Sequence, residues 1–311
     1  MQNQILGLHH VTAIADNAQR NHNFYTQVLG QRMVKKTVNF DDPGTYHFYY
    51  GNEHGEPGTI LTFFPWQGIG RGIAGTGMAT EISFAIAPDA LDFWTDRFKN
   101  FNVKTGERIE RFGETYQPFS DHDGLQLSLV GVTETDTRKG WETKDIKGAD
   151  ATKGFYNVTL SVRIMDETAK LLTDVFGYKQ ISQESTRFRF KTDSIHTASI
   201  IDILELPDGK MGRNSAGTNH HIAFRVPDEE TQMVYREKLL ERGLNVTHQI
   251  DRDYFFSIYF REPGGILFEI ATNNPGFTVD EPIDQLGTHL RLPKQYEHMR
   301  GKIEASLPAL K

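Results

Sequence analysis

The sequence predicts an α+β fold in which four βαβββ modules pair into two half-open barrels. The first observation behind this prediction is the order of signals, because a short alternating strand, a helix and several further strands recur four times along the chain. The second observation is their spacing. Equivalent positions in the first and last strand of each module lie 45 to 52 residues apart, in the pairs His10 and Thr62, Glu81 and Ser128, Asn157 and Asp202, and His221 and Glu269. Such regular spacing is typical of duplicated architectures.

The first module shows each of these signals. Its first strand is predicted at residues 6–14, with the sequence LGLHHVTAI. Its helix is expected to begin after Asp16, a good N-cap residue, and to stop at Gly30, a residue type that commonly follows a helix. Further extended segments are predicted at residues 45–51 and 58–64.

The other three modules repeat the pattern. Their first strands are predicted at residues 79–87, 155–163 and 219–226. Their helices are expected to begin at Pro88 and Asp89, after a cap at Asp166, and at Pro227 and Asp228. Their last strands, each preceded by a small residue, are predicted at residues 124–130, 198–204 and 264–272.

This pattern divides the chain into two pairs of modules. Residues 1–150 hold modules one and two, and residues 151–311 hold modules three and four with a C-terminal tail. The polar segment 132–153 is interpreted as the connector between these halves. The tail from residue 273 to residue 311 shows no strong period and is expected to wrap back over one face.

Composition excludes several classes of protein. The 311 residues include 34 basic and 41 acidic side chains, and this acidic balance argues against a nucleic-acid-binding protein. The absence of cysteine excludes disulfides, thiolate metal sites and a cysteine nucleophile. No apolar run approaches the roughly 18–20 residues of a membrane span, and the start of the chain does not resemble a signal peptide. The sequence therefore favours a cytoplasmic protein that does not bind membranes.

The alternation of strand side chains selects candidates for a cleft. His220 shares its strand face with the apolar residues of the same strand, which should pack under the helix, so His221 is predicted to face the cleft. Glu269 lies on the face opposite the apolar row of its own strand, where burial would be costly without a partner or a metal. We choose His10 over its neighbour because it matches His221 in the repeat.

Pairing the modules separates two sets of side chains. If modules one and four share a barrel, their cleft receives His10, Thr62, His221 and Glu269. The other cleft then receives Glu81, Ser128, Asn157 and Asp202, which include no histidine and look like a structural copy. Two imidazoles and one carboxylate form the facial triad of a non-haem Fe(II) site, with about three coordination positions open. An alternative is that Glu269 forms an ion pair with Arg252 or Arg261.

The other histidines receive a plainer interpretation. No repeat links them to one another, so we expect each to be a hydrogen-bonded core or surface residue, His47 among them. The aromatic residues at 48–50 and 63–66 suggest an aromatic-lined pocket, although ordinary core packing explains them about as well.

Seven motifs, in order and covering nearly the whole chain, resemble those of the ring-cleaving dioxygenases of the vicinal oxygen chelate superfamily, which also includes glyoxalases and bleomycin resistance proteins. They are LHHVTAI, FYTQVLGQRMVKKTVNFDD, HFYYGNEHGEPGTILTFFPW, RFGETYQPFSDHDGLQL, NHHIAFRV, YFREPGGILFEIAT and PGFTVDEP. The hydroquinone-type branch is the most similar. The resemblance implies the vicinal oxygen chelate fold, and Fe(II), or alternatively Mn(II), held by His10, His221 and Glu269. It also implies insertion of both atoms of O2 into a small aromatic substrate.

The same resemblance implies roles for five further residues. His9, Thr12, His220, Arg252 and Tyr259 match positions that contact substrate or dioxygen in that branch. A proton could move through His220 or His9, Tyr259 could hydrogen-bond the substrate, and Arg252 could face developing negative charge. The residues alone also allow a plain cleft-lining Thr12, a solvated Arg252 and an ordinary sheet Tyr259. For His220, strand alternation favours the helix side, so its placement near substrate rests on the resemblance.

Three rival functions share this architecture. A glyoxalase-like isomerase would use a fourth protein ligand, but the fourth position holds Thr62, a poor ligand. A metal-free protein that sequesters an aromatic drug would have no use for the triad. A thiol transferase would depend on a small thiol. The sequence leaves open the ring substituents and the choice between hydroquinone and catechol, and an exposed barrel edge is compatible with a homo-oligomer.

Overall fold

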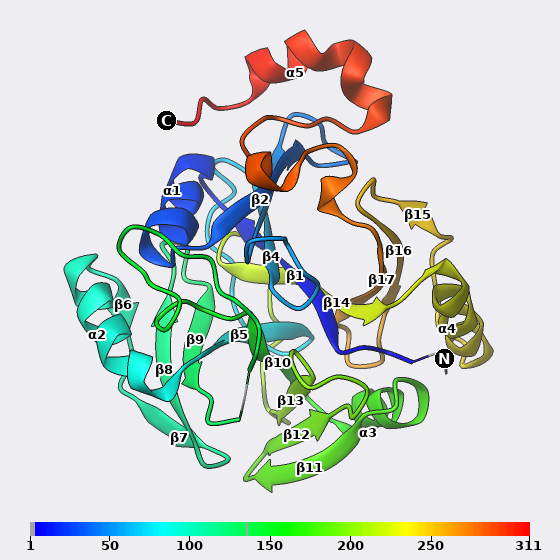
Figure 1. Cartoon of the computed structure of the whole chain (residues 1–311). Coiled ribbons are helices and arrows are strands. Elements are labelled where there is room, and N and C mark those ends of the chain that lie inside the picture. The colour runs from blue at the N-terminus through cyan, green and yellow to red at the C-terminus, as the bar shows by residue number, and fades with distance from the viewer. Residues whose placement is uncertain (1–3, 135) are drawn as a thin grey trace.

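Two curled sheets make up the computed structural model, which describes residues 4–134 and 136–311 (Figure 1). The first sheet draws its strands from modules one and four, at opposite ends of the chain. Its eight strands follow the order β15 (Ile250–Asp251), β16 (Phe255–Arg261), β17 (Leu267–Pro275), β14 (Thr218–Val226), β1 (Leu8–Ala15), β4 (Ile60–Pro65), β3 (Tyr46–Gly51) and β2 (Arg32–Val38). The predicted α+β class with paired modules is confirmed.

The second sheet draws its strands from modules two and three. Its order is β11 (Lys179–Glu184), β12 (Arg187–Lys191), β13 (Ile200–Glu205), β10 (Phe155–Val162), β5 (Met78–Ile86), β9 (Gln126–Gly131), β8 (Glu114–Ser120) and β6 (Lys104–Thr105), with β7 (Ile109–Arg111) paired to β8. In both sheets an antiparallel central pair joins two modules, β1 with β14 and β10 with β5. Each sheet takes strands from both sides of residue 150.

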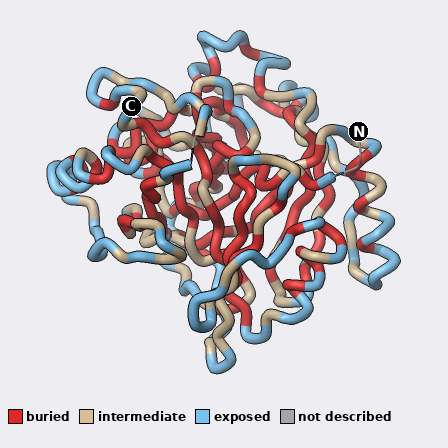
Figure 2. Tube along the Cα trace, turned by 60° about the horizontal axis from the view of Figure 1, so that its bottom comes forward, coloured by how far each residue is buried: buried red, intermediate tan, exposed pale blue. Residues whose placement is uncertain are grey.

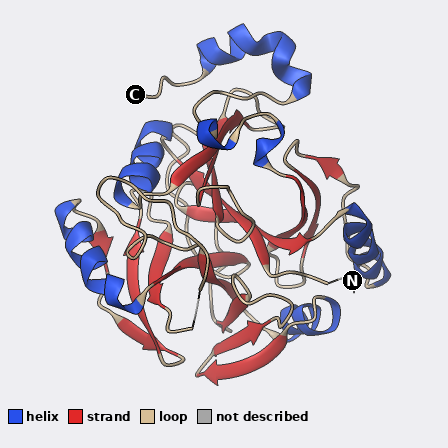
Figure 3. Ribbon diagram, in the orientation of Figure 1, coloured by secondary structure: helices blue, strands red, loops and turns tan. Residues whose placement is uncertain are grey.

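Helices lie on the outer faces of the two sheets (Figure 3). Those that follow the first strands of the four modules are α1 (Ala18–Asn23) with η1 (Phe24–Val28), η2 (Pro88–Ala90) with α2 (Leu91–Asn100), α3 (Asp166–Lys170) with η3 (Leu171–Val175), and α4 (Glu229–Glu241). The Asp228 side chain caps α4 as predicted, by accepting a hydrogen bond from the Thr231 amide. The predicted caps at Asp16 and Asp166 are wrong. Asp166 is the first residue of α3, and no side-chain hydrogen bond caps that helix. Asn17 caps α1, while the Asp16 carboxylate accepts the Gly68 amide.

The tail packs back over the β2 side of the first sheet, as predicted. It contains η4 (Phe277–Val279), η5 (Ile283–Gln285), η6 (Lys294–Met299) and α5 (Arg300–Ser306), seen at the top of Figure 1. Lys35 on β2 is completely buried and forms ion pairs with Asp280 at 2.6 Å and Glu281 at 2.5 Å. The Tyr46 hydroxyl donates to the Pro308 carbonyl at 3.0 Å. These contacts fix the tail against the strands that carry the site described below.

Buried residues run along the strands of both sheets (Figure 2). The predicted connector also contributes to the core, because Ile146 is fully buried and Arg138 donates to the Gly58 and Phe155 carbonyls. No helix within residues 4–134 and 136–311 is long and apolar enough to cross a bilayer.

A bulge in β14 changes the direction of its histidines. Thr12 and Ala13 on β1 pair with His221 and Asn219, so His220 is an extra residue with no partner across the ladder. A bulge of this kind interrupts the alternation of side chains between the two faces. The prediction that His220 packs on the helix side is therefore wrong, because that prediction assumed a regular strand.

The partner strand β1 carries a matching bulge. Leu8 and His10 pair with Phe224 and Ala223, so His9 is the extra residue. Each of the two adjacent histidine pairs therefore begins with a bulged residue and ends with a residue that stays in the ladder.

Candidate metal centre and active-site cavity

His10, His221 and Glu269 converge from the central strands β1, β14 and β17. Their ligand atoms all lie within 4.8 Å of one another, and they are the one group of three or more such side chains found in residues 4–134 and 136–311. Glu269 Oε2 lies 3.3 Å from His10 Nε2 and 2.9 Å from His221 Nε2. The alternative pairing of Glu269 with an arginine is not what the structure has, since Arg261 donates to the Gly265 carbonyl and Arg252 approaches Tyr259 and Asp41.

The unpaired atoms of this group fit a metal ion. Glu269 Oε2 and His221 Nε2 are buried, and neither has a hydrogen-bond partner of good geometry among the described residues, despite their 2.9 Å separation. A buried polar atom without a hydrogen-bond partner lowers the stability of the fold. A cation between Glu269 Oε2 and His221 Nε2 would accept a lone pair from each atom. Nitrogen and carboxylate donors suit a first-row divalent ion. Thr62, the fourth repeat position, instead bonds to Thr12 and His47.

Charge in the group also favours a cation. Burial opposes the charged form of Glu269, but His10 and His221 hold the pKa of this carboxyl well below its ordinary value. Burial lowers the pKa of His221, which favours the neutral imidazole that binds metals. The Glu269 carboxylate is further held by the Ser257 hydroxyl, which donates to Oε1.

Each candidate ligand histidine is held by the histidine that precedes it. The Nδ1 atoms of His9 and His10 lie 2.9 Å apart, and those of His220 and His221 lie 2.8 Å apart. If Nε2 of the second histidine binds a metal, its Nδ1 carries the proton and donates to the first histidine. Such outer partners fix the tautomer and orientation of metal ligands.

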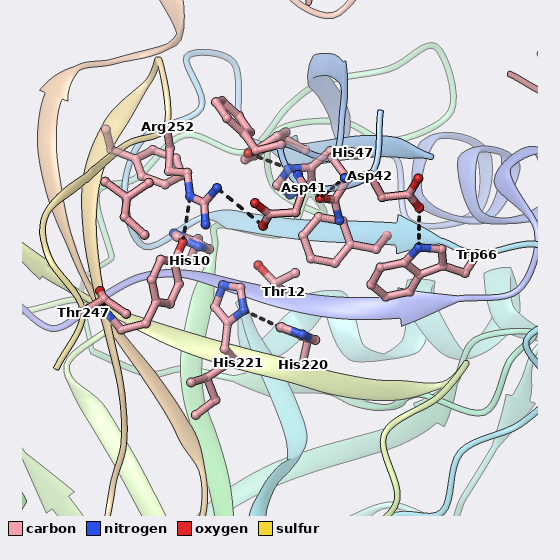
Figure 4. Close-up of a pocket in the computed structure, with 18 residues that line it drawn as sticks. His10, Thr12, Asp41, Asp42, His47, Trp66, His220, His221, Thr247 and Arg252 are labelled. Atoms are coloured by element: carbon pink, nitrogen blue, oxygen red, sulfur yellow. Dashed lines mark hydrogen bonds and ion pairs between the residues drawn. The ribbon is translucent and has the colours of Figure 1, made fainter. Parts of the chain in front are cut away.

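A cavity of about 450 Å3 opens beside the group. Six aromatic side chains contribute to its walls, namely Phe40, Tyr49, Phe64, Trp66, Phe255 and Tyr259. Three of them come from the aromatic segments that suggested such a pocket, so this prediction is confirmed. Figure 4 shows Arg252 reaching toward Asp41 across the pocket, His220 beside His221, and Trp66 bonded to Asp42. A planar ring fits between walls of this kind.

Four of the five further residues line this cavity, namely Thr12, His220, Arg252 and Tyr259. Arg252 is not a solvated hairpin residue, since its Nε donates to the Tyr259 hydroxyl at 3.3 Å. Burial raises the pKa of Tyr259, so the phenol keeps its proton.

His9 is the exception among the five. It is buried outside the cavity lining, where it contacts His10, the Phe255 ring and the backbone of Thr272. Its bulged position places His9 behind the candidate ligand His10 and not in the cavity wall, where the resemblance led us to expect it.

His47 is the residue that the sequence interpretation missed. It lines the cavity from β3, with Nε2 2.9 Å from Thr62 Oγ1 and Nδ1 2.9 Å from the Tyr49 hydroxyl. No repeat links His47 to the other histidines, which is why it was interpreted as an ordinary core residue. Its position two residues before Tyr49, on the same face of a strand, was the available signal.

The equivalent cleft of the second sheet is closed by internal hydrogen bonds. Ser128 Oγ donates to Glu81 at 2.6 Å, and Asn157 Nδ2 donates to Asp202 at 2.9 Å. These four positions form no group that could hold a metal among the described residues. The interpretation of this set as a structural copy agrees with its geometry.

Comparisons with known proteins agree on one family. Residues 7–129 and 154–270 match the sequence model of the Glyoxalase/Bleomycin resistance protein/Dioxygenase superfamily. MhqO of Bacillus subtilis (strain 168), which carries the provisional name of ring-cleaving dioxygenase, is 44% identical over 99% of this chain and 97% of its own length. The chlorohydroquinone/hydroquinone 1,2-dioxygenase of Sphingobium indicum is 30% identical over 96% of this chain and 95% of its own.

Solved structures extend this likeness to the fold. A Bacillus subtilis protein, provisionally described as a dioxygenase, superposes with a TM-score of 0.95 at 43% identity, over 99% of this chain and 98% of that chain. Glyoxalase I from Zea mays superposes with a TM-score of 0.64 at 14% identity, over 91% of this chain and 97% of that chain. The second likeness concerns the fold alone.

Proposed function

This chain belongs to the Glyoxalase/Bleomycin resistance protein/Dioxygenase superfamily, and from that premise we propose that it is a ring-cleaving dioxygenase. It opens the ring of a hydroquinone-like aromatic by inserting both atoms of O2. The observation that carries the proposal is the pair of unpaired atoms, His221 Nε2 and Glu269 Oε2, beside a cavity walled by aromatic side chains. The names of MhqO and of the Sphingobium enzyme support the same reaction class.

The metal ligands in this proposal are His10, His221 and Glu269, and the metal is Fe(II), with Mn(II) as the alternative. Three protein donors leave about three positions open for substrate and dioxygen. When bound, the ion supplies Lewis acidity at a phenolic oxygen and electron transfer to dioxygen. The fourth position adds no ligand, because the Thr62 hydroxyl is already bonded to Thr12 and His47.

The cavity side chains bind and orient the ring. Phe64, Trp66 and Phe255 supply apolar walls for a planar substrate. The Tyr259 hydroxyl, which keeps its proton, donates to a substrate oxygen. Arg252 lies beside it and faces negative charge that develops as the ring opens. Desolvation would lower the pKa of Arg252, but Tyr259 and Glu269 raise it above its ordinary value, so the guanidinium stays charged.

The two bulged histidines take different roles. His220 lines the cavity and contacts substrate or dioxygen, whereas His9 orients the ligand His10 from behind. Burial lowers the pKa of His220 to about 3, so it meets the substrate as a neutral imidazole. A neutral imidazole can accept one proton and donate another, which suits proton transfer during ring opening.

Oxygen uptake after anaerobic loading with Fe(II) tests this proposal. A panel of substituted hydroquinones and catechols should give stoichiometric oxygen consumption and a ring-opened acid with at least one hydroquinone. Loading with Mn(II) in parallel distinguishes the two metals. Fully loaded protein that consumes no oxygen with any member of the panel would refute the proposal, and an isomerase would show that behaviour.

A further inference from the structure

Four polar side chains form an unbroken hydrogen-bonded chain along one wall of the cavity. The Tyr49 hydroxyl lies 2.9 Å from His47 Nδ1, and His47 Nε2 lies 2.9 Å from Thr62 Oγ1. Thr62 Oγ1 in turn lies 2.9 Å from Thr12 Oγ1. We call this series, Tyr49, His47, Thr62 and Thr12, the relay chain.

The sheet itself holds the relay chain in place. Thr62 on β4 pairs across the ladder with Thr12 on β1 and with Tyr49 on β3, so the three residues form one row over three adjacent strands. His47 stands two residues before Tyr49 and therefore on the same face. Rigid central strands keep such a row within hydrogen-bond distance without a loop movement.

Three members of the relay chain line the cavity, and the fourth, Thr62, does not. Tyr49, His47 and Thr12 line the cavity, whereas Thr62 is completely buried behind it. Thr12 is two residues from the candidate ligand His10, and the Tyr49 ring packs 6.5 Å from Phe255, which in turn packs against His10. The chain thus connects two points of the cavity, Tyr49 and Thr12, through His47 and the completely buried Thr62.

The donors and acceptors leave the relay chain two self-consistent directions. In one, Tyr49 donates to His47, His47 to Thr62, Thr62 to Thr12, and Thr12 offers its proton to the cavity. In the other, every bond is reversed and Tyr49 offers the proton. Burial, with neighbouring His10, His221 and Arg252, holds the pKa of His47 well below its ordinary value. The imidazole is therefore neutral and presents one donor and one acceptor nitrogen.

We propose that the relay chain carries a proton from one side of the bound substrate to the other, with His47 as its central relay residue. This inference rests on the proposed function, in which a hydroxyl of the aromatic substrate loses a proton and an oxygen of the opening ring gains one.

The transfer conserves protons at every group. A substrate hydroxyl next to Tyr49 gives its proton to Oη, and Tyr49 passes its own proton to His47 Nδ1. His47 releases the proton on Nε2 to Thr62 Oγ1. Thr62 passes its proton to Thr12 Oγ1, and Thr12 gives its proton to a substrate oxygen beside it. The chain ends neutral with all its bonds reversed, and no electron leaves or enters it.

The buried link Thr62 gives the sharpest test, because it does not touch substrate. Thr62→Val has nearly the same shape and removes the hydroxyl, whereas Thr62→Ser keeps it. With Fe(II)-loaded protein, kcat for oxygen uptake should fall about 10²-fold in Thr62→Val, the lower end of the range for acid–base groups. KM and iron content should stay within about threefold, and Thr62→Ser should retain most of its activity.

A rescue experiment separates relay from packing. His47→Ala should lose activity to a similar extent, and added imidazole should restore part of its kcat while leaving Thr62→Val unimproved. Imidazole with the unsubstituted protein measures any inhibition through the metal.

Equal rates for Thr62→Val and Thr62→Ser would overturn the relay, even if His47→Ala does not fold. Absence of uptake by the unsubstituted protein would instead contradict the proposed function.

Discussion

The two sheets carry the same architecture and use it differently. Each has an antiparallel central pair with two bulges, at His9 and His220 in the first sheet and at Tyr156 and Thr80 in the second. The bulges are therefore a property of the repeated module and not of the metal site. What differs is the side chains at the ladder positions that follow them.

The carboxylates of the two clefts, completely buried at Asp202 and Glu269 and partly buried at Glu81, are neutralised differently. In the second sheet, Arg111 donates twice to Glu81, at 2.9 and 2.8 Å, and Arg189 donates twice to Asp202, at 2.8 and 3.0 Å. In the first sheet, the Glu269 carboxylate lies beside His10 and His221 instead of pairing with an arginine. A buried carboxylate needs a countercharge. The second sheet supplies arginine side chains as the countercharge, whereas in the first sheet Glu269 and the two histidines form a group that fits a cation.

The largest effect should follow removal of a candidate ligand. His10→Ala, His221→Ala and Glu269→Ala should each lose metal and at least about 100-fold in activity, since even outer-shell partners of metal ligands are worth 10–100-fold. Ser128→Ala, at the position of the second sheet equivalent to Glu269, is the matched control and should keep its metal. Mass spectrometry measures the iron content of each variant, and oxygen uptake measures its activity. Full iron occupancy in a ligand variant would refute that ligand.

The second-largest effect should be a loss of stability when the ion pair between Arg189 and Asp202 in the second sheet is removed. Arg189→Met removes both arginine hydrogen bonds to the buried Asp202 and leaves only one arginine, Arg187, at 3.7 Å, so the free energy of unfolding should fall by about 3 kcal/mol. In the metal-free protein, Glu269→Gln should cost less, because burial favours the neutral form of His221, one of the two histidines beside this carboxylate, whereas the arginine beside Asp202 stays charged. Urea denaturation of both variants without metal makes the comparison. A larger loss in Glu269→Gln than in Arg189→Met would reverse the distinction between the clefts.

A smaller effect should distinguish the two bulged histidines. His9→Phe should weaken metal affinity by about 10–100-fold, because His10 loses the partner that orients it. His220→Phe removes the same kind of partner from His221 and also a group that lines the cavity, so its kcat at saturating metal should fall further. Metal titration and turnover at saturating Fe(II) separate the two quantities. If both variants have the same metal affinity and the same kcat, the position of His220 in the cavity wall does not affect turnover.

The smallest effect is expected for Tyr259→Phe. The variant should keep its metal, because no candidate ligand bonds to the phenol, and ring opening should slow by about tenfold, the size of one lost hydrogen bond of about 1.4 kcal/mol. Stopped-flow measurement of product formation gives the rate. An unchanged rate removes Tyr259 from the reaction.

Repeat spacing predicted the part of the site that the duplicated module defines. His10, His221 and Glu269 could be selected from the sequence because the two histidines share the first-strand position of their modules and Glu269 holds the last-strand position of its module, and alternation along the strands narrowed the choice. The fold class followed from the same four-fold order.

What the sequence could not give depends on local departures from regular structure and on contacts between neighbouring strands of one module. His220 was placed on the wrong face because a bulge is invisible to a rule of strict alternation. His47 belongs to the third strand of its module, and only the packing of β3 against β4 brings it to Thr62. The arginines of the second cleft were likewise unpredicted, since Arg111 and Arg189 lie on edge-side strands.

Isotope labelling of the product tests the central claim most directly. The unsubstituted protein, loaded anaerobically with Fe(II) and given a hydroquinone under ¹⁸O2, should yield a ring-opened acid that carries oxygen from O2, while Glu269→Ala yields none. Formation of the unlabelled quinone, or product without oxygen consumption, would contradict the account.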